Sequence, residues 1–353
     1  MVAKSRRKFI GLVSSAWACV TYAAHSFSLS SVAFLSGVYH PLAETIMGEL
    51  SALGVPGDAS LPEWIDGAIA ATGSTNYLAL NNPTDRIGFT VEGTGTLKIN
   101  WGDGTEQSIA LTTSDQVVAK VFAGGAANRP VVLVGNLTKF QSTGAAGEGG
   151  VDATKFGGVI STMPSLTYLH VTGTNTLSGS VAALTGLTFL YVAGTNTLSG
   201  SVANLTGFTR LWVTGTNTLS GSVAGLTGLS FMFVSGTNTL SGSVAGLTGL
   251  TYLYVTGSNT ITGWSGLASS ATGLCFLNQG GSTVLDATEI NGILAGFWAN
   301  RDAAKTRSER IITLNKAGNA APTGQGITDK AALQAYRSPN NDGAKALWTV
   351  TTN

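Results

Sequence analysis

The sequence predicts a mainly β protein built around a solenoid, with a small β-sandwich-like domain before it and an α/β cap after it. The first observation is a repeat of 21 residues that runs through the middle of the chain. A fixed period of this length is typical of solenoids, in which each repeat stacks on the next. The second observation is a change to alternating strands before the repeats and to helical spacing after them. We therefore expect four regions: 1–60 as an apolar arm, 61–140 as the β-sandwich-like domain, 152–281 as the solenoid and 282–353 as the cap.

Composition excludes several classes of function. Charged residues make up 10% of the 353 residues and the formal net charge is +1, so nothing favours binding to nucleic acid or to an anionic membrane surface. The two cysteines, Cys19 and Cys275, cannot form a disulfide framework, and the three histidines lack metal-ligand spacing. We expect no metal and no cofactor. Cys275 is expected to act as a small apolar residue in a slot that aromatic residues hold in other repeats.

The N-terminal region has two interpretations. Arg6 and Arg7 precede a mildly apolar stretch, which resembles a twin-arginine export signal occupying 1–25. That stretch is shorter than the roughly 20 apolar residues that a membrane span needs. Apolar character continues over 31–54, past any signal peptide, and this favours a retained arm that anchors the protein in a larger assembly. Both interpretations stay open.

In the β-sandwich-like domain, IGFTVEG and TLKINW are expected to be two of several short antiparallel strands. Leu97, Ile99 and Trp101 fall on one face of the second of these strands. The glycines of the following WGDGT segment supply the backbone conformations that a tight turn needs. This segment resembles the turn motif of PKD-like immunoglobulin folds, which are common in surface proteins. We expect Asp103 to form the turn rather than to serve as a metal ligand or a catalytic carboxylate.

Each repeat follows the pattern L-x-x-L-x-V-x-G-T-N-x-L-S-G-S-V-A-x-L-x-G. Leucine and valine alternate on the inward face of a short strand, and no single repeat can close such a core, so stacking is obligatory. The pattern resembles the leucine-rich repeat over about residues 154–278, and its LSGSVAxL half resembles the variant that carries LSGxIP. Because a buried amide must be hydrogen-bonded, we expect a structural ladder of the asparagines that mark the period: Asn175, Asn196, Asn217, Asn238 and Asn259.

Variation between the copies is concentrated at two positions, one on either side of the inward leucine. In a strand these positions point away from the core, onto the exposed concave face. A contiguous aromatic surface indicates a partner, and Tyr, Trp and Arg dominate binding hot spots. We expect either a ligand-binding face or an interface covered by another chain or by the N-terminal arm. The ligand-binding candidates are Tyr168, His170, Phe189, Tyr191, Arg210, Trp212, Phe231, Phe233, Tyr252 and Tyr254.

Catalysis is not expected. Between Leu166 and Ser270 the only charged residue is Arg210. The repeats therefore lack a carboxylate pair for glycoside hydrolysis and an acid that would orient His170 in a catalytic triad. The chain contains no P-loop and no HExxH motif.

After the repeats, the sequence predicts an α/β cap that shields the open end of the solenoid. Residues 284–303 are expected to form a helix with Asp286 as its N-cap and Glu289 three residues on. The apolar face of this helix comprises Ile290, Ile293, Leu294 and Phe297. The remaining elements are expected in the order strand, helix, strand: 310–315, 326–338 and 346–353.

The order of arm, WGDGT module, near-identical repeats and cap resembles leucine-rich-repeat proteins among phage tail-fibre and virion-surface components. The resemblance implies a non-enzymatic structural protein of the virion surface, whose N-terminal region contacts other virion proteins and whose repeats bind a host-surface glycan or protein. A glycan fits because aromatic faces stack on sugar rings, and a homo-oligomer is expected. Two alternatives stay open: a twin-arginine-exported adhesin of the bacterial cell surface, and a purely structural subunit whose aromatic columns form an oligomer interface.

Overall fold

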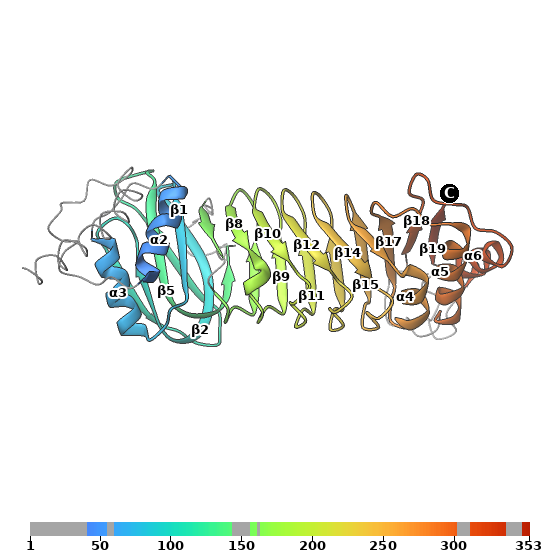
Figure 1. Cartoon of the computed structure of the whole chain (residues 1–353), viewed down its shortest axis with the longest axis horizontal. Helices are drawn as coiled ribbons and strands as arrows, with labels where there is room; N and C mark the ends of the chain where they lie inside the picture. Colours follow the sequence, from blue (N-terminus) through green and yellow to red (C-terminus); the bar gives the residue numbers. More distant parts are fainter. Residues whose placement is uncertain (1–40, 55–59, 143–155, 161–162, 302–310, 337–347) are drawn as a thin grey trace, which may run out of the picture.

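The protein is elongated, with an N-terminal β module, a solenoid in the middle and an α/β region at the C-terminal end (Figure 1). The N-terminal segment 1–40, on which the export-signal and anchor interpretations depend, lies outside the described residues. The computed structural model describes residues 41–54, 60–142, 156–160, 163–301, 311–336 and 348–353.

Two short helices pack against the sheet of the N-terminal module. They are α2 (Pro41–Ala52) and α3 (Leu61–Thr72), and each presents one apolar stripe. Ile46 and Ile65 are fully buried and share a cluster with Tyr77 of the first strand. Part of the region expected to be an arm, the segment from residue 41 onward, is therefore integrated into the module.

The N-terminal module has five strands: β1 (Tyr77–Asn82), β2 (Arg86–Asn100), β3 (Glu106–Ala110), β4 (Gln116–Val121) and β5 (Arg129–Gln141). Strand β2 pairs antiparallel with β3, β4 and β5. Two strands were expected where the single long β2 runs. The strand bends at register shifts instead, one of them between Glu92 and Gly93, and Gly93 sits where a Cβ atom would collide with the carbonyl oxygen of Asn136.

The WGDGT segment forms the tight turn that the sequence predicts. Trp101 is buried with Leu97 and Ile99, as the alternation indicated. The Oδ1 atom of Asp103 accepts a hydrogen bond of 3.0 Å from the backbone N–H of Thr105. Asp103 thus closes the turn, and it also forms an ion pair of 2.9 Å with Lys120 on β4.

The sheet of the N-terminal module continues without a break into the solenoid. Strand β5 is antiparallel to β1 and β2, and its C-terminal half is parallel to the first strand of the repeats, with Lys139 opposite Tyr168. Strand β1 pairs with β6, the first strand of the second row described below. The boundary expected near residue 140 therefore falls inside a continuous sheet, and the module closes the N-terminal end of the solenoid core.

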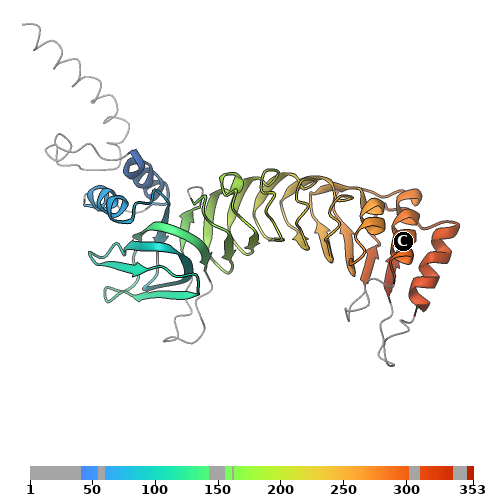
Figure 2. The same cartoon turned by 90° about the horizontal axis from the view of Figure 1, so that it is seen from below.

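The repeats form a solenoid with two rows of parallel strands, which confirms the predicted fold class. Figure 2 shows the successive turns bending into a shallow arch, with helix α4 on its outer side. The first row contains β7 (Tyr168–Val171), β9 (Phe189–Val192), β11 (Arg210–Val213), β13 (Phe231–Val234) and β15 (Tyr252–Thr256). The second row contains β6 (Gly157–Val159), β8 (Thr176–Ser180), β10 (Thr197–Ser201), β12 (Thr218–Ser222), β14 (Thr239–Ser243) and β16 (Thr260–Thr262). A 3-10 helix, η2 (Val181–Ala183), follows β8.

The asparagines that mark the period are fully buried and hydrogen-bonded between turns. Asn217 accepts a hydrogen bond from the backbone N–H of Leu198, one turn earlier, at 2.9 Å, and its Nδ2 donates to the carbonyl oxygen of Thr214 at 2.8 Å. This satisfies backbone groups that the turns leave without a strand partner. The same pair of bonds is made by Asn175, Asn196, Asn238 and Asn259.

The C-terminal region continues the first row of strands and covers it with helices. Strands β17, β18 and β19 are parallel to one another and to β15. Helix α5 begins as predicted, because Asp286 accepts a hydrogen bond from the backbone N–H of Glu289 at 2.8 Å. The elements are α4 (Trp264–Ser270), β17 (Phe276–Gly280), α5 (Ala287–Ala299), β18 (Ile311–Leu314), α6 (Gln325–Ala335) and β19 (Thr349–Thr352).

One feature of this region was not predicted from the sequence. Asn319 accepts a hydrogen bond from the backbone N–H of Leu285 and donates to the carbonyl oxygen of Leu314, both at 2.9 Å. These are the same two bonds that the repeat asparagines make. The cap is therefore an extension of the solenoid, and the segment IITLNKAGN carries a faint version of the repeat pattern.

Candidate functional site

The ten candidate residues all lie on the first row of strands and alternate with its buried leucines and valines. We call this surface the ring face. Nine of its residues are half-buried and Arg210 is exposed. The parallel strands are in register, so the residues form two columns along the solenoid. Column one contains Tyr168, Phe189, Arg210, Phe231 and Tyr252, and column two contains His170, Tyr191, Trp212, Phe233 and Tyr254.

Most neighbouring rings of each column stack on one another, whereas His170 is tilted by 55° against Tyr191. In column two, the Trp212 and Phe233 centroids are 4.4 Å apart and those of Phe233 and Tyr254 are 4.2 Å apart, with planes within 9° and 3° of parallel. In column one, Phe231 and Tyr252 stack at 4.5 Å. The cause is geometric: neighbouring strands lie about 4.7–4.9 Å apart, which is close to the separation of stacked rings.

Stacking decides which part of each ring a partner can reach. Where two rings of a column stack, their faces are turned toward one another, and the ring edges and polar tips are what a partner can reach. A sugar ring that stacks on aromatic faces, as the glycan hypothesis required, would find most of these faces covered. The surface offered to a partner is a row of ring edges.

Arg210 interrupts column one. On one side of it, Phe189 stacks on Tyr168 at 4.2 Å; on the other side, Phe231 stacks on Tyr252. Trp212 bridges the columns, because its ring lies 5.5 Å from that of Phe231 and is parallel to it within 8°. The guanidinium is therefore a single cation set in the middle of an aromatic surface.

A cluster of charges closes the N-terminal end of the ring face. The Nζ atom of Lys139 lies 4.8 Å from the centroid of the Tyr168 ring and 3.2 Å from a carboxylate oxygen of Glu92, and it also contacts Asp115. Burial lowers the pKa of His170 below 6.5, and the nearby Lys139 lowers it further. His170 is therefore neutral at pH 7, so the positive charges here are Lys139, which is paired, and Arg210.

The ring face extends beyond the predicted residues. Phe276 of β17 pairs with Tyr252 and stacks on it at 4.2 Å. The expectation that Cys275 takes an aromatic slot is wrong, because helix α4 inserts residues and displaces the register, so that Phe276 fills the slot. Cys275 is buried, and its Sγ atom lies 3.2 Å from the carbonyl oxygen of Thr251. The spacing of Leu274 and Leu277, which matches the L-x-x-L of the repeats, was the signal that could have corrected the register.

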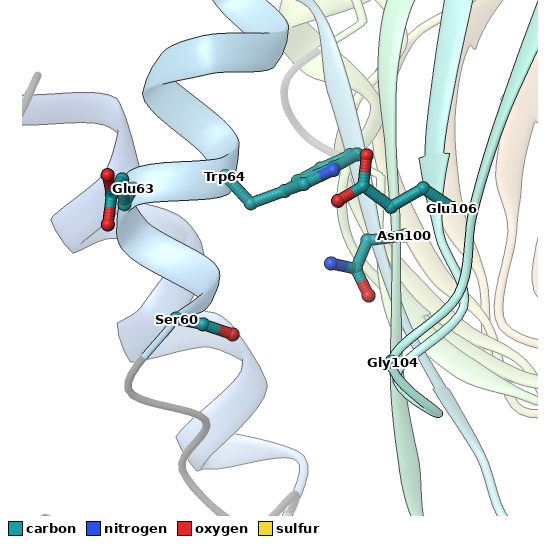
Figure 3. Close-up of a pocket in the computed structure, with 6 residues that line it drawn as sticks. All are labelled: Ser60, Glu63, Trp64, Asn100, Gly104 and Glu106. Atoms are coloured by element: carbon teal, nitrogen blue, oxygen red, sulfur yellow. The ribbon is translucent and has the colours of Figure 1, made fainter.

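A pocket of about 280 Å³ lies between α3 and the β2–β3 turn, and none of its lining residues belongs to the ring face (Figure 3). Glu63 and Glu106, its two carboxylates, are both exposed. Among the residues that the structure describes, no group of three or more His, Cys, Asp or Glu side chains could hold a metal ion. No helix within the described ranges is both long and apolar enough to span a bilayer. The pocket is lined by Ser60, Glu63, Trp64, Asn100, Gly104 and Glu106.

No protein-family model and no curated protein matches the chain. Among solved structures, the PEPR1–AtPEP1 crystal structure is similar over 53% of this chain, with 16% identity and a TM-score of 0.36, and the match covers a quarter (25%) of that chain's length. An internalin (inlF) from Listeria monocytogenes is similar over 59% of this chain and 87% of its own length, with 16% identity and a TM-score of 0.19. The function is therefore inferred from the ring face itself.

Proposed function

We propose that this protein is a non-enzymatic recognition protein whose ring face binds a protein partner. The observation that carries the proposal is the aromatic surface across five neighbouring strands, with an exposed arginine at its centre. Half-buried aromatic side chains and arginine are the residue types that dominate binding hot spots. The solenoid behind them is rigid, so these side chains are held ready to bind at little cost in conformational entropy.

We place this protein on the surface of a phage virion, where the N-terminal region contacts other virion proteins and the ring face meets a host-surface protein. The setting comes from the order of its parts: a WGDGT module, the repeats and an α/β end, carried on an apolar N-terminal segment. In the alternative setting, an exported adhesin of the bacterial cell surface, the ring face has the same role. A homo-oligomer would assemble through other surfaces.

The proposal is tested by selecting displayed random dodecapeptides against the full-length protein and mapping where the selected peptides bind. Peptides that bind the ring face should lose affinity for the double variant Tyr191→Ala/Phe233→Ala. They should keep their affinity for Thr218→Ala/Thr239→Ala, which changes exposed side chains of the second row. Selected peptides that bind both variants equally would show that the ring face is not the recognition surface.

A further inference from the structure

We propose that the partner bound by the ring face is an acidic protein segment, and that Arg210 is the residue that selects it by pairing with a carboxylate. This inference rests on the proposed function and names the chemistry of the ligand. It is carried by three observations: the charge balance of the ring face, the orientation of its rings and the break in column one.

Within the part of the chain that the structure describes, no carboxylate compensates the charge of Arg210. No acidic residue occurs between Leu166 and Ser270, and none of the ion pairs among the described residues involves Arg210. The other cation at this surface, Lys139, is already paired with Glu92 and Asp115. A partner that covers the ring face would desolvate the Arg210 guanidinium, and a carboxylate is the group that best offsets that cost.

The orientation of the rings favours a negatively charged partner as well. An aromatic ring carries a quadrupole that is negative over its faces and positive at its edge. Because Trp212, Phe233 and Tyr254 stack face to face, their edges point outward together. The ring edges therefore make the exposed surface around Arg210 weakly electropositive, in addition to the one unpaired charge of Arg210 itself.

The break in column one gives the carboxylate a defined place. Tyr168 covers one face of the Phe189 ring, and the next residue of the column on the other side is Arg210 instead of a ring. The Arg210 side chain is exposed between Phe189 and Phe231. A carboxylate that approaches here meets a guanidinium flanked by apolar surface, where an ion pair is screened less than in open solvent.

The ring face of a second copy does not fit the same surface. Two ring faces placed against each other would bury Arg210 without a carboxylate, because the repeats contain none. An arginine buried without a partner is strongly destabilising. The charge balance therefore argues against the interpretation in which the aromatic columns form a face-to-face oligomer interface.

The test uses the peptides that bind the ring face in the selection described above. They should be enriched in Asp or Glu, and Arg210→Gln should weaken their binding roughly 30-fold, the size of a hot-spot loss. Arg210→Lys should restore part of the affinity, and Lys98→Gln, which removes a positive charge from strand β2, should leave the affinity unchanged.

Two results would overturn this inference without affecting the proposed function. One is a set of ring-face peptides that lack acidic residues and bind Arg210→Gln as well as the unaltered protein. The other is binding of polygalacturonic acid that depends on Arg210, with no acidic peptide selected, which would make the ligand an acidic polysaccharide. If no selected peptide maps to the ring face at all, the proposed function fails and this inference fails with it.

Discussion

The ring of Phe233 lies 4.2 Å from the ring of Tyr254, centroid to centroid, and the two planes are within 3° of parallel. The two residues are 21 positions apart in the sequence and directly opposite each other in paired strands. Their contact shows how the repeat works: an in-register parallel row of strands turns aromatic residues at one repeat position into a continuous stack. The stack is both a structural element and the surface that a partner meets.

We expect this stack to stabilise the solenoid measurably. A double-mutant cycle with Phe233→Leu and Tyr254→Leu should give a coupling free energy of about 0.5–1.5 kcal/mol, the usual range for an aromatic pair. The measurement is the free energy of unfolding from urea titration of each variant. A cycle between Tyr168→Leu and Tyr254→Leu, which are four strands apart, serves as the control and should give a value near zero. Equal coupling in both cycles would mean that the stacking contact itself contributes nothing.

Removal of one asparagine from the ladder should destabilise the protein strongly. In Asn217→Ala, the buried backbone N–H of Leu198 and the partly buried carbonyl oxygen of Thr214 both lose their partner. The loss of these two hydrogen bonds predicts a decrease of about 2–4 kcal/mol in the free energy of unfolding. Thr218→Ala, one residue later and exposed, should change it by less than about 0.5 kcal/mol. Similar values for the two variants would contradict a structural role for the ladder.

Glycine is required at the turn after each strand of the first row. Gly215 has a φ of 81°, and a Cβ atom there would collide with the carbonyl oxygen of Gly194 in the preceding turn. Gly215→Ala should therefore lower the free energy of unfolding by about 1–3 kcal/mol. Gly246→Ala is the matched control, since no atom lies within 4 Å of its added Cβ, and it should be neutral or slightly stabilising. Thermal unfolding of the two variants separates these outcomes.

The pKa of His170 gives the protein a pH dependence with a defined sign. Burial and Lys139 hold this pKa below 6.5 in the folded state, so the unfolded chain binds a proton more tightly. The His170 contribution to stability is therefore complete above pH 6.5 and is lost as the pH falls toward the lowered folded value.

NMR titration of the His170 ring checks this assignment. Lys139→Gln should raise the pKa of His170 but leave it below 6.5, because burial is the larger cause. Arg210→Gln should not move it, since Arg210 is not among the causes of the shift. A His170 pKa at or above 6.5 in the unaltered protein would contradict the desolvated environment that the structure shows.

The solenoid could be predicted from the sequence because its determinants are local and repeated. Each turn of the solenoid is constrained by the 21-residue period, by the alternation of leucine and valine and by a buried asparagine. The helix cap at Asp286 could be predicted because it depends on two residues close in sequence. The two columns of the ring face could also be predicted from the sequence, since strand alternation decides which residues point outward.

The features that could not be predicted from the sequence depend on contacts between distant segments. The continuation of β5 into the solenoid brings Lys139 beside Tyr168, and nothing in the local pattern of either segment indicates this pairing. The placement of Phe276 in the aromatic slot likewise could not be predicted, because it depends on the register of β17, which helix α4 displaces. That neighbouring aromatic rings cover one another follows only from side-chain orientation. Of the two ligands expected from the sequence, a glycan or a protein, this covering disfavours a stacked sugar and favours a group that meets ring edges and Arg210.

The most direct test of this account is hydroxyl-radical footprinting of Trp212 in the full-length protein, read by mass spectrometry. Trp264, which is 1% exposed, provides a buried reference of the same residue type. We predict that Trp212 is oxidised much faster than Trp264 in the free protein and becomes protected when a ring-face peptide is bound. If Trp212 were as protected as Trp264 in the free protein, the ring face would be permanently covered by another part of the chain or by a second copy, and it could not be the recognition surface.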